Sequence, residues 1–110
     1  MMTIIDASSE LDELLETSNR FFLMKHSLTC PVSADAMKEM EQAEPELRTP
    51  VYVIHVQEFR GGCTKTADHY GVKHESPQVL LIDGGKVQNH TSHWHVTADW
   101  IKAGDEAAGN

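Results

Sequence analysis

The sequence lacks most features that would place a protein outside a reducing compartment or within a membrane. Its 110 residues include only two cysteines, Cys30 and Cys63, which are too few and too far apart for a secreted disulfide framework. The N-terminal residues have neither a basic start nor a long apolar run, so we expect no secretory signal peptide. No segment approaches membrane-spanning length. These absences predict a cytoplasmic domain without a membrane partner. In a reducing cytoplasm, an ionised cysteine is more typical of catalysis than of structure.

Basic residues are also scarce. Nine Lys and Arg residues stand against 17 Asp and Glu residues and give a formal net charge of −8, which argues against nucleic acid as a partner. The basic groups recur in short stretches that we expect to be connecting loops, where they either meet to form a local positive field or belong to ordinary solvated surface. These groups are Lys25, His26, Arg60, Lys65, Lys73 and His74.

What the chain does contain is an alternation of helical and strand patterns. Continuous apolar runs rich in β-branched residues indicate strands, and apolar residues three or four positions apart indicate helices. Gly84 and Gly85, between the apolar stretch at 79–82 and a polar strand at 87–90, predict a hairpin. The expected helices lie at 10–16, 31–44, 63–70 and around Trp100, and the expected strands lie at 21–24, 51–56, 79–82 and 87–90.

This order of elements predicts one α/β domain over residues 1–103 and a loose acidic tail over 104–110. The alternation favours a partly parallel sheet of about four strands, with helices on both faces and the hairpin as an antiparallel edge. Chemistry in such sheets collects beyond the carboxyl ends of the central strands. The residues that follow the strand at 21–24 are therefore the first place to look for a site.

Cys30 lies there, at the junction between that strand and the next helix. Pro31 suits the first helical position, because its φ is fixed and its missing N–H would be unpaired anyway. A sulfur at the N-cap faces the free N–H groups of Val32 and Ser33 and the positive end of the helix dipole. Both favour the thiolate, so we expect a nucleophile, with a buried structural cysteine as the alternative.

Two stretches resemble the signature stretches of a known family. Residues 25–33 read KHSLTCPVS, and residues 72–82 read VKHESPQVLLI. Both look like those of the monothiol bacilliredoxins, which are thioredoxin-like proteins of the bacillithiol system. The first stretch alone would also suit monothiol glutaredoxins, and the second is what favours bacilliredoxins. The resemblance covers about residues 4–100 and implies a thioredoxin-like fold.

By this resemblance Cys30 is the nucleophile, and Ser33 stands where a dithiol thioredoxin carries its resolving cysteine. A hydroxyl can hydrogen-bond a thiolate but cannot displace a disulfide, so release needs a thiol from elsewhere. Pro77 matches the cis-proline of the fold, with the backbone of Ser76 opposite the nucleophile. The residues expected to support the active site are Thr29, Pro31, Val32, Ser33, Ser76 and Pro77.

The resemblance implies an oxidoreductase that removes bacillithiol from S-bacillithiolated cysteines through a mixed disulfide on Cys30. No tightly bound cofactor is expected, because bacillithiol itself is the co-substrate. The partners are then S-bacillithiolated proteins and a bacillithiol-disulfide reductase. The carboxylates of bacillithiol's malate suit basic partners. The candidate thiol-binding residues are Lys25, His26, Lys73 and His74.

Two other signals have competing interpretations. Cys63 is a conceivable resolving thiol, but a cysteine that packs a helix is the better prediction. His90, His93 and His95 have a spacing that can reach one metal ion, but no carboxylate or cysteine joins them with ligand spacing, so we predict no metal site. Two functional alternatives stay open. One is a glutaredoxin-like protein or cluster carrier that uses another small thiol, and the other is a non-enzymatic thioredoxin-fold adaptor or metal-binding module.

Overall fold

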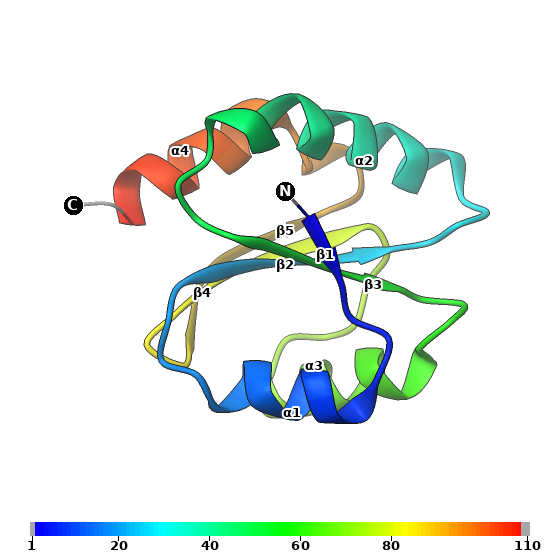
Figure 1. The fold of residues 1–110 in the computed structure, drawn as a ribbon. Helices are drawn as coiled ribbons and strands as arrows, with labels where there is room; N and C mark the ends of the chain where they lie inside the picture. The colour runs from blue at the N-terminus through cyan, green and yellow to red at the C-terminus, as the bar shows by residue number, and fades with distance from the viewer. Residues whose placement is uncertain (1, 109–110) are drawn as a thin grey trace.

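The chain builds one five-stranded mixed sheet with helices on both faces, as seen in a computed structural model that describes residues 2–108 (Figure 1). The strands are β1 (Met2–Ile4), β2 (Phe21–His26), β3 (Val51–His55), β4 (Gln78–Asp83) and β5 (Lys86–Ser92). The helices are α1 (Ser8–Glu16), α2 (Pro31–Ala43), α3 (Arg60–Tyr70) and α4 (Ala98–Ala108), with short 3-10 helices η1 (Glu44–Glu46) and η2 (His93–His95). The strand order is β1-β3-β2-β4-β5. The expected α/β class is therefore confirmed.

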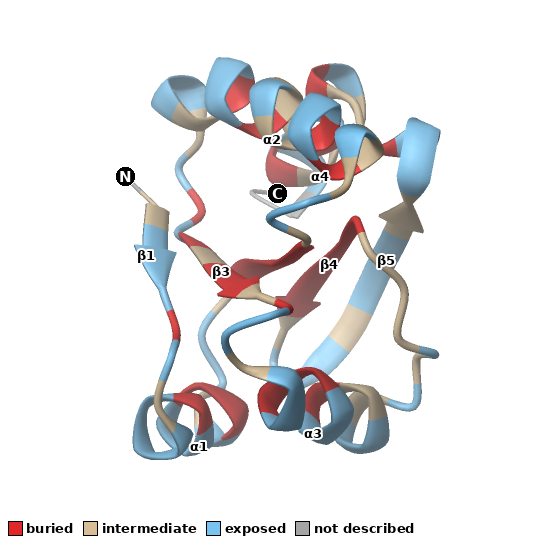
Figure 2. Ribbon diagram, turned by 90° about the vertical axis from the view of Figure 1, so that its right-hand side faces the viewer, coloured by how far each residue is buried: buried red, intermediate tan, exposed pale blue. Residues whose placement is uncertain are grey.

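Strand β2 lies in the middle of the sheet and is buried over its whole length. It pairs parallel with β3 and antiparallel with β4. Because side chains alternate along a strand, Phe22 and Met24 pack with α2 and α4, whereas Phe21 and Leu23 pack with α1 and α3. The two helical layers lie above and below the sheet (Figure 1), and their buried residues face it (Figure 2). A continuous apolar run is what a strand covered on both faces requires.

The expectation of about four strands was one too low, because β1 escaped the sequence pattern. This strand is three residues long and pairs with β3 at the edge of the sheet. Its residues are exposed or half-buried, so it carries no apolar run. Its position is held by backbone hydrogen bonding, which continues with the Ile5 N–H donating to the Val53 carbonyl at 2.8 Å. A short strand defined by backbone pairing leaves little trace in side-chain type.

Helix α3 begins at Arg60, three residues before the expected start at Cys63, so Gly61 and Gly62 lie in its first turn. Gly62 is required there for steric reasons. A Cβ atom at that position would lie 2.6 Å from the ring of Phe59, the residue that precedes the helix. Gly62 thus allows the ring of Phe59 to pack against the first turn of the helix.

The sequence predicted a loose tail over 104–110. This expectation was wrong for residues up to Ala108, because α4 continues to that residue. Residues 109 and 110 lie outside the described residues. Asp105 explains the difference: its side chain is 3% exposed and ties α4 to the segment before β3. It accepts hydrogen bonds from the N–H groups of Arg48 (3.2 Å) and Thr49 (3.0 Å) and from the Thr49 hydroxyl. We call Asp105 and Thr49, with the Arg20 Nε that donates to the Thr49 hydroxyl at 3.0 Å, the Asp105 brace.

The brace sets the charge state of its own carboxyl group. Burial works against ionisation, but the hydrogen bonds from the Thr49 hydroxyl and from the two backbone N–H groups outweigh it and hold the pKa of Asp105 below its ordinary value. The end of the molecule that seemed least structured from sequence is therefore held by a buried, ionised side chain. None of the helices among residues 2–108 is long and apolar enough to cross a membrane.

Candidate active site

Cys30 is the N-cap of α2, as predicted, with φ −95° and ψ 124°, and Pro31 is the first helical residue. The Cys30 carbonyl accepts the first helical hydrogen bond, from the Ala34 N–H at 3.0 Å. The thiol is free and half-exposed. It makes no capping hydrogen bond of its own, in keeping with the weak acceptor strength of a neutral thiol. A thiolate at this place would face the unpaired N–H groups of the helix.

The sheet brings two further segments to the edge where Cys30 lies. Strands β2 and β3 are parallel and end there together, with His26 beside His55, and the antiparallel β4 begins there, with Gln78 beside Lys25. The Ser76–Pro77 bond just before β4 is cis, as the resemblance implied. By continuation of the register, Pro77 lies next to the last residue of β2. The cis peptide and the segment leading to Cys30 therefore share one edge.

Residues Ser27, Leu28 and Thr29, here called the Cys30 loop, join β2 to Cys30. Ser33 is fully buried, and its hydroxyl accepts the Ser27 N–H at 3.2 Å. This serine thus anchors the loop. Three of the expected support residues flank Cys30 in the chain: Thr29 and Pro31 are exposed and Val32 is half-buried.

Gln57, which sequence reasoning missed, holds the same loop from the other side. Its Oε1 accepts the Leu28 N–H at 2.9 Å, and its Nε2 donates to the hydroxyls of Ser27 (2.7 Å) and Thr29 (3.1 Å). The available signal was its position two residues beyond β3, at the edge where β2 also ends. Nothing in the local sequence indicates which loop its amide would meet.

For two of the four candidate thiol-binding residues, burial contradicts the expected role. Lys25 is 1% exposed, and its ammonium reaches the Cys63 carbonyl at 3.5 Å instead of the surface. Burial lowers the pKa of Lys25, and the nearby Cys63 opposes that shift. His26 is 9% exposed, and burial followed by the neighbouring His55 lowers its pKa. Because both lie in a strand covered on both faces, neither presents its charge to a ligand at the surface.

The other two candidates remain accessible. Lys73 is exposed and His74 is half-buried. Burial lowers the pKa of His74, and the positive charges of Lys25 and Arg60 lower it further. The loops around this edge therefore do bring basic groups together. Lys65 is not part of this group, since it forms an ion pair with Asp12 of α1.

Cys63 is 3% exposed and packs in the core cluster between the sheet and helices α1 and α3. Helix α2 packs on the opposite face of the sheet. Burial raises the pKa of the Cys63 thiol, while Lys25 and Arg60 partly counteract it. The packing interpretation of Cys63 is therefore confirmed, and its environment disfavours the thiolate that a resolving role would need.

The three histidines near the C-terminal part of the chain do not converge. His90 lies in β5, His93 and His95 lie in η2, and all three are exposed. Among residues 2–108, no three or more His, Cys, Asp or Glu side chains are grouped as metal ligands. Segment η2 does approach the site, because the His93 N–H donates to the Pro77 carbonyl at 3.0 Å.

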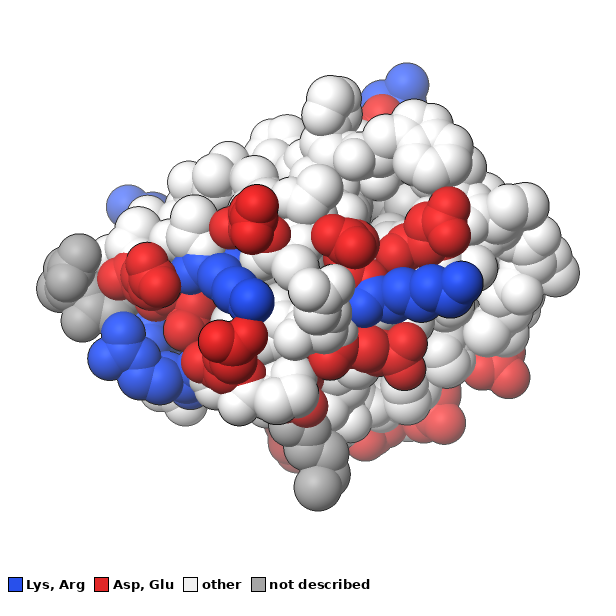
Figure 3. Space-filling view, turned by 90° about the horizontal axis from the view of Figure 1, so that it is seen from above, with Lys and Arg blue, Asp and Glu red and all other residues white. Residues whose placement is uncertain are grey.

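Apolar side chains are exposed around the nucleophile. Leu28 is 50% exposed and Trp94 of η2 is 67% exposed. A groove of about 270 Å³ runs between α2 and η2, with Val32 and Trp94 among its lining residues. Over the outer surface of α2 and α4, Lys and Arg side chains lie among Asp and Glu and do not gather into one basic patch (Figure 3). The outer surface of α2 and α4, beside this groove, therefore has mixed charge.

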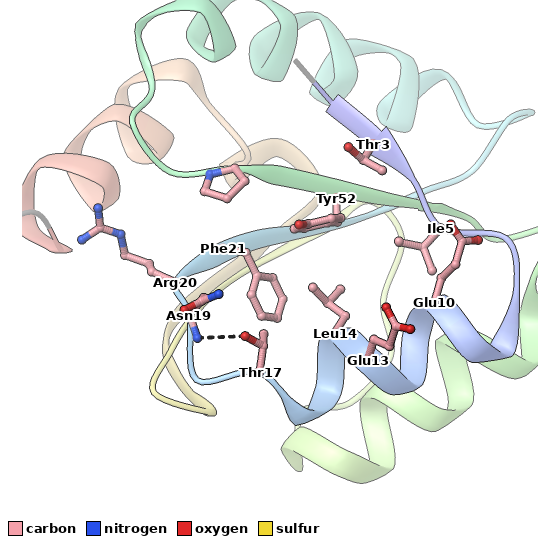
Figure 4. Close-up of a pocket in the computed structure, with 11 residues that line it drawn as sticks. Thr3, Ile5, Glu10, Glu13, Leu14, Thr17, Asn19, Arg20, Phe21 and Tyr52 are labelled. Carbon is pink, nitrogen blue, oxygen red and sulfur yellow. Dashed lines mark hydrogen bonds between the residues drawn. The ribbon is translucent and has the colours of Figure 1, made fainter.

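A larger hollow, of about 340 Å³, lies away from these residues. Helix α1, the start of β2 and the edge strand β1 border it, and Glu10, Glu13 and Tyr52 are among the residues that line it (Figure 4). It includes none of the residues predicted for the site. Cavity size alone would thus point to the wrong part of this molecule.

Comparison with known proteins agrees with this arrangement. The model of the family described as monothiol bacilliredoxin BrxC matches residues 3–101. Among solved structures, a proposed oxidoreductase with a thioredoxin fold is 25% identical, with a TM-score of 0.85 over 94% of this chain and 92% of that one. A thioredoxin of Trypanosoma brucei brucei is 10% identical, with a TM-score of 0.79 over 98% and 90% of the two chains. A mutant thioredoxin of Halobacterium salinarum is 18% identical, with a TM-score of 0.75 over 96% and 88%. The expected thioredoxin-like fold is confirmed.

Proposed function

The chain belongs to the monothiol bacilliredoxin family, and from this premise we propose that it removes bacillithiol from S-bacillithiolated proteins through a mixed disulfide on Cys30. The observation that carries the proposal is the half-exposed thiol of Cys30 at the start of α2, with a serine instead of a second cysteine one turn further on. At the coarser level, the family and the thioredoxin fold support a thiol–disulfide oxidoreductase.

The reaction is two successive thiol–disulfide exchanges. The Cys30 thiolate attacks the bacillithiol sulfur of the modified protein, so a bond forms between Cys30 and bacillithiol while the protein sulfur leaves as a thiolate and takes a proton. A second bacillithiol thiolate then attacks the bacillithiol sulfur held on Cys30. This step releases bacillithiol disulfide and returns the Cys30 thiolate. Each step exchanges one S–S bond for another, so the two steps together are redox-neutral, and the only net reduction comes afterwards, when a separate reductase uses two electrons from its own reductant to cleave the bacillithiol disulfide.

The surroundings of Cys30 support a one-thiol mechanism. Ser33 supplies a hydroxyl where a dithiol enzyme would supply the second thiol, and this hydroxyl is already engaged with the Ser27 N–H. Cys63 is buried in the cluster on the other face of the sheet. Release from the mixed disulfide therefore falls to a small thiol that comes from solution. We propose Lys73 and His74 as contacts for the carboxylates of that thiol, since they are the accessible basic residues near the cis peptide.

We further propose that the protein works in the cytoplasm, with bacillithiol as co-substrate and no tightly bound cofactor. A reducing compartment with a pool of small thiol would keep Cys30 in its reactive form. The partners would be S-bacillithiolated proteins and a bacillithiol-disulfide reductase.

Mass spectrometry tests the proposal. Protein oxidised in the presence of bacillithiol should carry one bacillithiol adduct on Cys30. The Cys30→Ser variant should lose the adduct and release no bacillithiol from an S-bacillithiolated peptide, whereas Cys63→Ser should keep most of the activity. In the Ser33→Cys variant the adduct should convert to an internal disulfide.

Other outcomes would point elsewhere. An adduct of a different small thiol, in protein purified from its own cells without reductant, would favour a glutaredoxin-like protein. Loss of turnover in Cys63→Ser with the Cys30 adduct trapped would make Cys63 the resolving thiol and contradict the one-thiol mechanism.

A further inference from the structure

We infer that Gln57 is a positioning residue that holds the Cys30 nucleophile in line for exchange, a role that rests on the proposed function of Cys30. The amide of Gln57 is hydrogen-bonded to each residue of the Cys30 loop, from Ser27 to Thr29. One side chain thus spans the whole connection between the end of β2 and the reactive cysteine. It does so from the turn after β3, far away in the sequence.

The orientation of this amide follows from its partners. The Leu28 N–H, 2.9 Å from Gln57, can only donate, so the atom that faces it must be the side-chain oxygen. The NH2 group then faces the two hydroxyls, at 2.7 Å for Ser27 and 3.1 Å for Thr29. All three contacts are satisfied by one orientation of the amide.

The platform that carries Gln57 is itself held by the sheet. The Val56 N–H donates to the His26 carbonyl at 2.9 Å, and the N–H groups of Glu58 and Phe59 both donate to the His55 carbonyl at 3.0 Å. The backbone on either side of Gln57 is therefore tied to the ends of β2 and β3. A side chain on such a firmly held turn can fix a loop relative to the sheet, even when the loop itself makes few packing contacts.

The Cys30 loop needs an external restraint, because burial does not supply one. Leu28 is 50% exposed, and Thr29 is exposed as well. Ser33 fixes the first N–H of the loop, at Ser27, and Gln57 fixes the next one, at Leu28. Exchange requires the attacking, central and leaving sulfur atoms to approach one line, and a misplacement of about 1 Å can cost about a hundredfold in rate. The two anchors together set where the Cys30 sulfur can point.

The test compares two reactions of Cys30 that differ in how freely the second reactant can approach the sulfur. The Gln57→Met variant keeps the side-chain length and loses the amide. We expect it to exchange with an S-bacillithiolated peptide, whose bulk limits its approach to Cys30, about tenfold more slowly than the wild type, whereas alkylation of Cys30 by the small, freely diffusing iodoacetamide changes by less than about twofold. The Leu28 amide should also exchange faster with deuterium, as seen by NMR.

Two further variants separate positioning from general stability. Gln57→Glu keeps an acceptor for the Leu28 N–H, and the hydroxyls of Ser27 and Thr29 can donate to its carboxylate, so it should restore Leu28 protection and most of the exchange rate. Gln88→Ala is the matched control, because Gln88 is an exposed glutamine of β5 whose Nε2 donates to the Asp83 carbonyl at 3.1 Å, at the other end of the sheet. It should match the wild type in both reactions.

The outcomes distinguish this role from the proposed function. If Gln57→Met keeps wild-type exchange and Leu28 protection, the positioning role is wrong while the function of Cys30 stands. An equal fall in exchange and in alkylation would also overturn it, because a loop that merely loosens or unfolds does not discriminate between the two reactions. If the wild type exchanges with no disulfide, the proposed function fails and the role of Gln57 in exchange fails with it; lost Leu28 protection in Gln57→Met would then show only that Gln57 anchors the Cys30 loop.

Discussion

The Asp105 brace and the Cys30 end of the sheet treat their buried polar groups in opposite ways. At the end where β2 and β3 begin, the Asp105 brace pairs a buried carboxylate with backbone and hydroxyl donors. At the Cys30 end, three buried side-chain atoms have no hydrogen-bond partner within the described residues, namely His26 Nδ1, His74 Nδ1 and Gln78 Oε1. The buried ammonium of Lys25 there has a carbonyl at 3.5 Å as its hydrogen-bond partner.

This difference indicates how stability and chemistry are divided in the molecule. Satisfied buried polar groups stabilise a fold, and unsatisfied ones destabilise it and gather where function requires particular groups. Exposed apolar side chains are also found at the Cys30 end, where Leu28 and Trp94 lie at the surface. The brace therefore contributes to stability, whereas the Cys30 end exposes a free thiol and apolar side chains.

The largest effect on stability is expected from breaking the brace. Asp105→Ala leaves the buried Thr49 N–H and the partly buried Arg48 N–H without their acceptor, so the free energy of unfolding should fall by about 3 kcal/mol. Exchange by the folded protein should stay unchanged, because Cys30 lies at the other end. Urea unfolding and exchange rates measure the two effects. Glu106→Ala, on the same helix and exposed, is the control and should change stability by less than about 0.5 kcal/mol.

The brace also predicts part of the acid sensitivity. Because hydrogen bonding lowers the pKa of Asp105 in the folded state, its stabilisation is complete above the ordinary carboxyl pKa and is lost as the pH falls through the lower folded value. Asp105→Asn should remove this part of the pH dependence of unfolding. An unchanged acid dependence in that variant would mean that the carboxylate does not hold α4 to the segment before β3.

A smaller effect of opposite sign is expected from Lys25 at the Cys30 end. Lys25→Met removes a buried charge but keeps an apolar side chain of similar length, so the free energy of unfolding should rise by about 1 to 2 kcal/mol at neutral pH. Because burial lowers the pKa of Lys25, the stability of the wild type should rise as the pH increases toward the ordinary lysine pKa, and the variant should lack this rise. Urea unfolding from neutral to alkaline pH measures both.

Lys65→Met is the matched control for that prediction, since Lys65 lies on the surface, paired with Asp12. It should change the free energy of unfolding by less than about 1 kcal/mol. A larger loss of stability in Lys25→Met than in Lys65→Met would show that the buried lysine is a structural partner, and the contrast between the two ends would no longer hold.

The smallest effect concerns Cys63. Burial raises the pKa of its thiol and leaves it 3% exposed, so iodoacetamide should modify Cys30 well before Cys63 at neutral pH. Lys25 partly counteracts that raised pKa, so Lys25→Met should slow Cys63 further without changing Cys30. Peptide mapping after timed alkylation gives both rates. Equal rates for the two cysteines would mean that the core near Lys25 opens readily, contrary to the packing described here.

Sequence patterns succeeded where the structure depends on neighbours in the chain. The apolar run of β2 identified a strand buried on both faces, and Cys30 with Pro31 identified the start of α2. The cis bond before Pro77 came from the resemblance and not from any local pattern. The failures have one common cause. Short β1 is defined by backbone pairing, and Asp105 is ordered by donors more than 50 residues away.

By itself, the sequence determined the fold class, the place of Cys30 at the start of α2 and the absence of a second thiol one turn beyond it, because these depend on periodicity, capping and residue type. The tertiary structure alone decided which polar groups serve the site. Lys25 precedes Cys30 by five positions, yet the alternation of β2 turns it into the core, and Gln57 reaches the Cys30 loop because β2 and β3 end side by side. Strand register, which no local pattern encodes, sets these contacts.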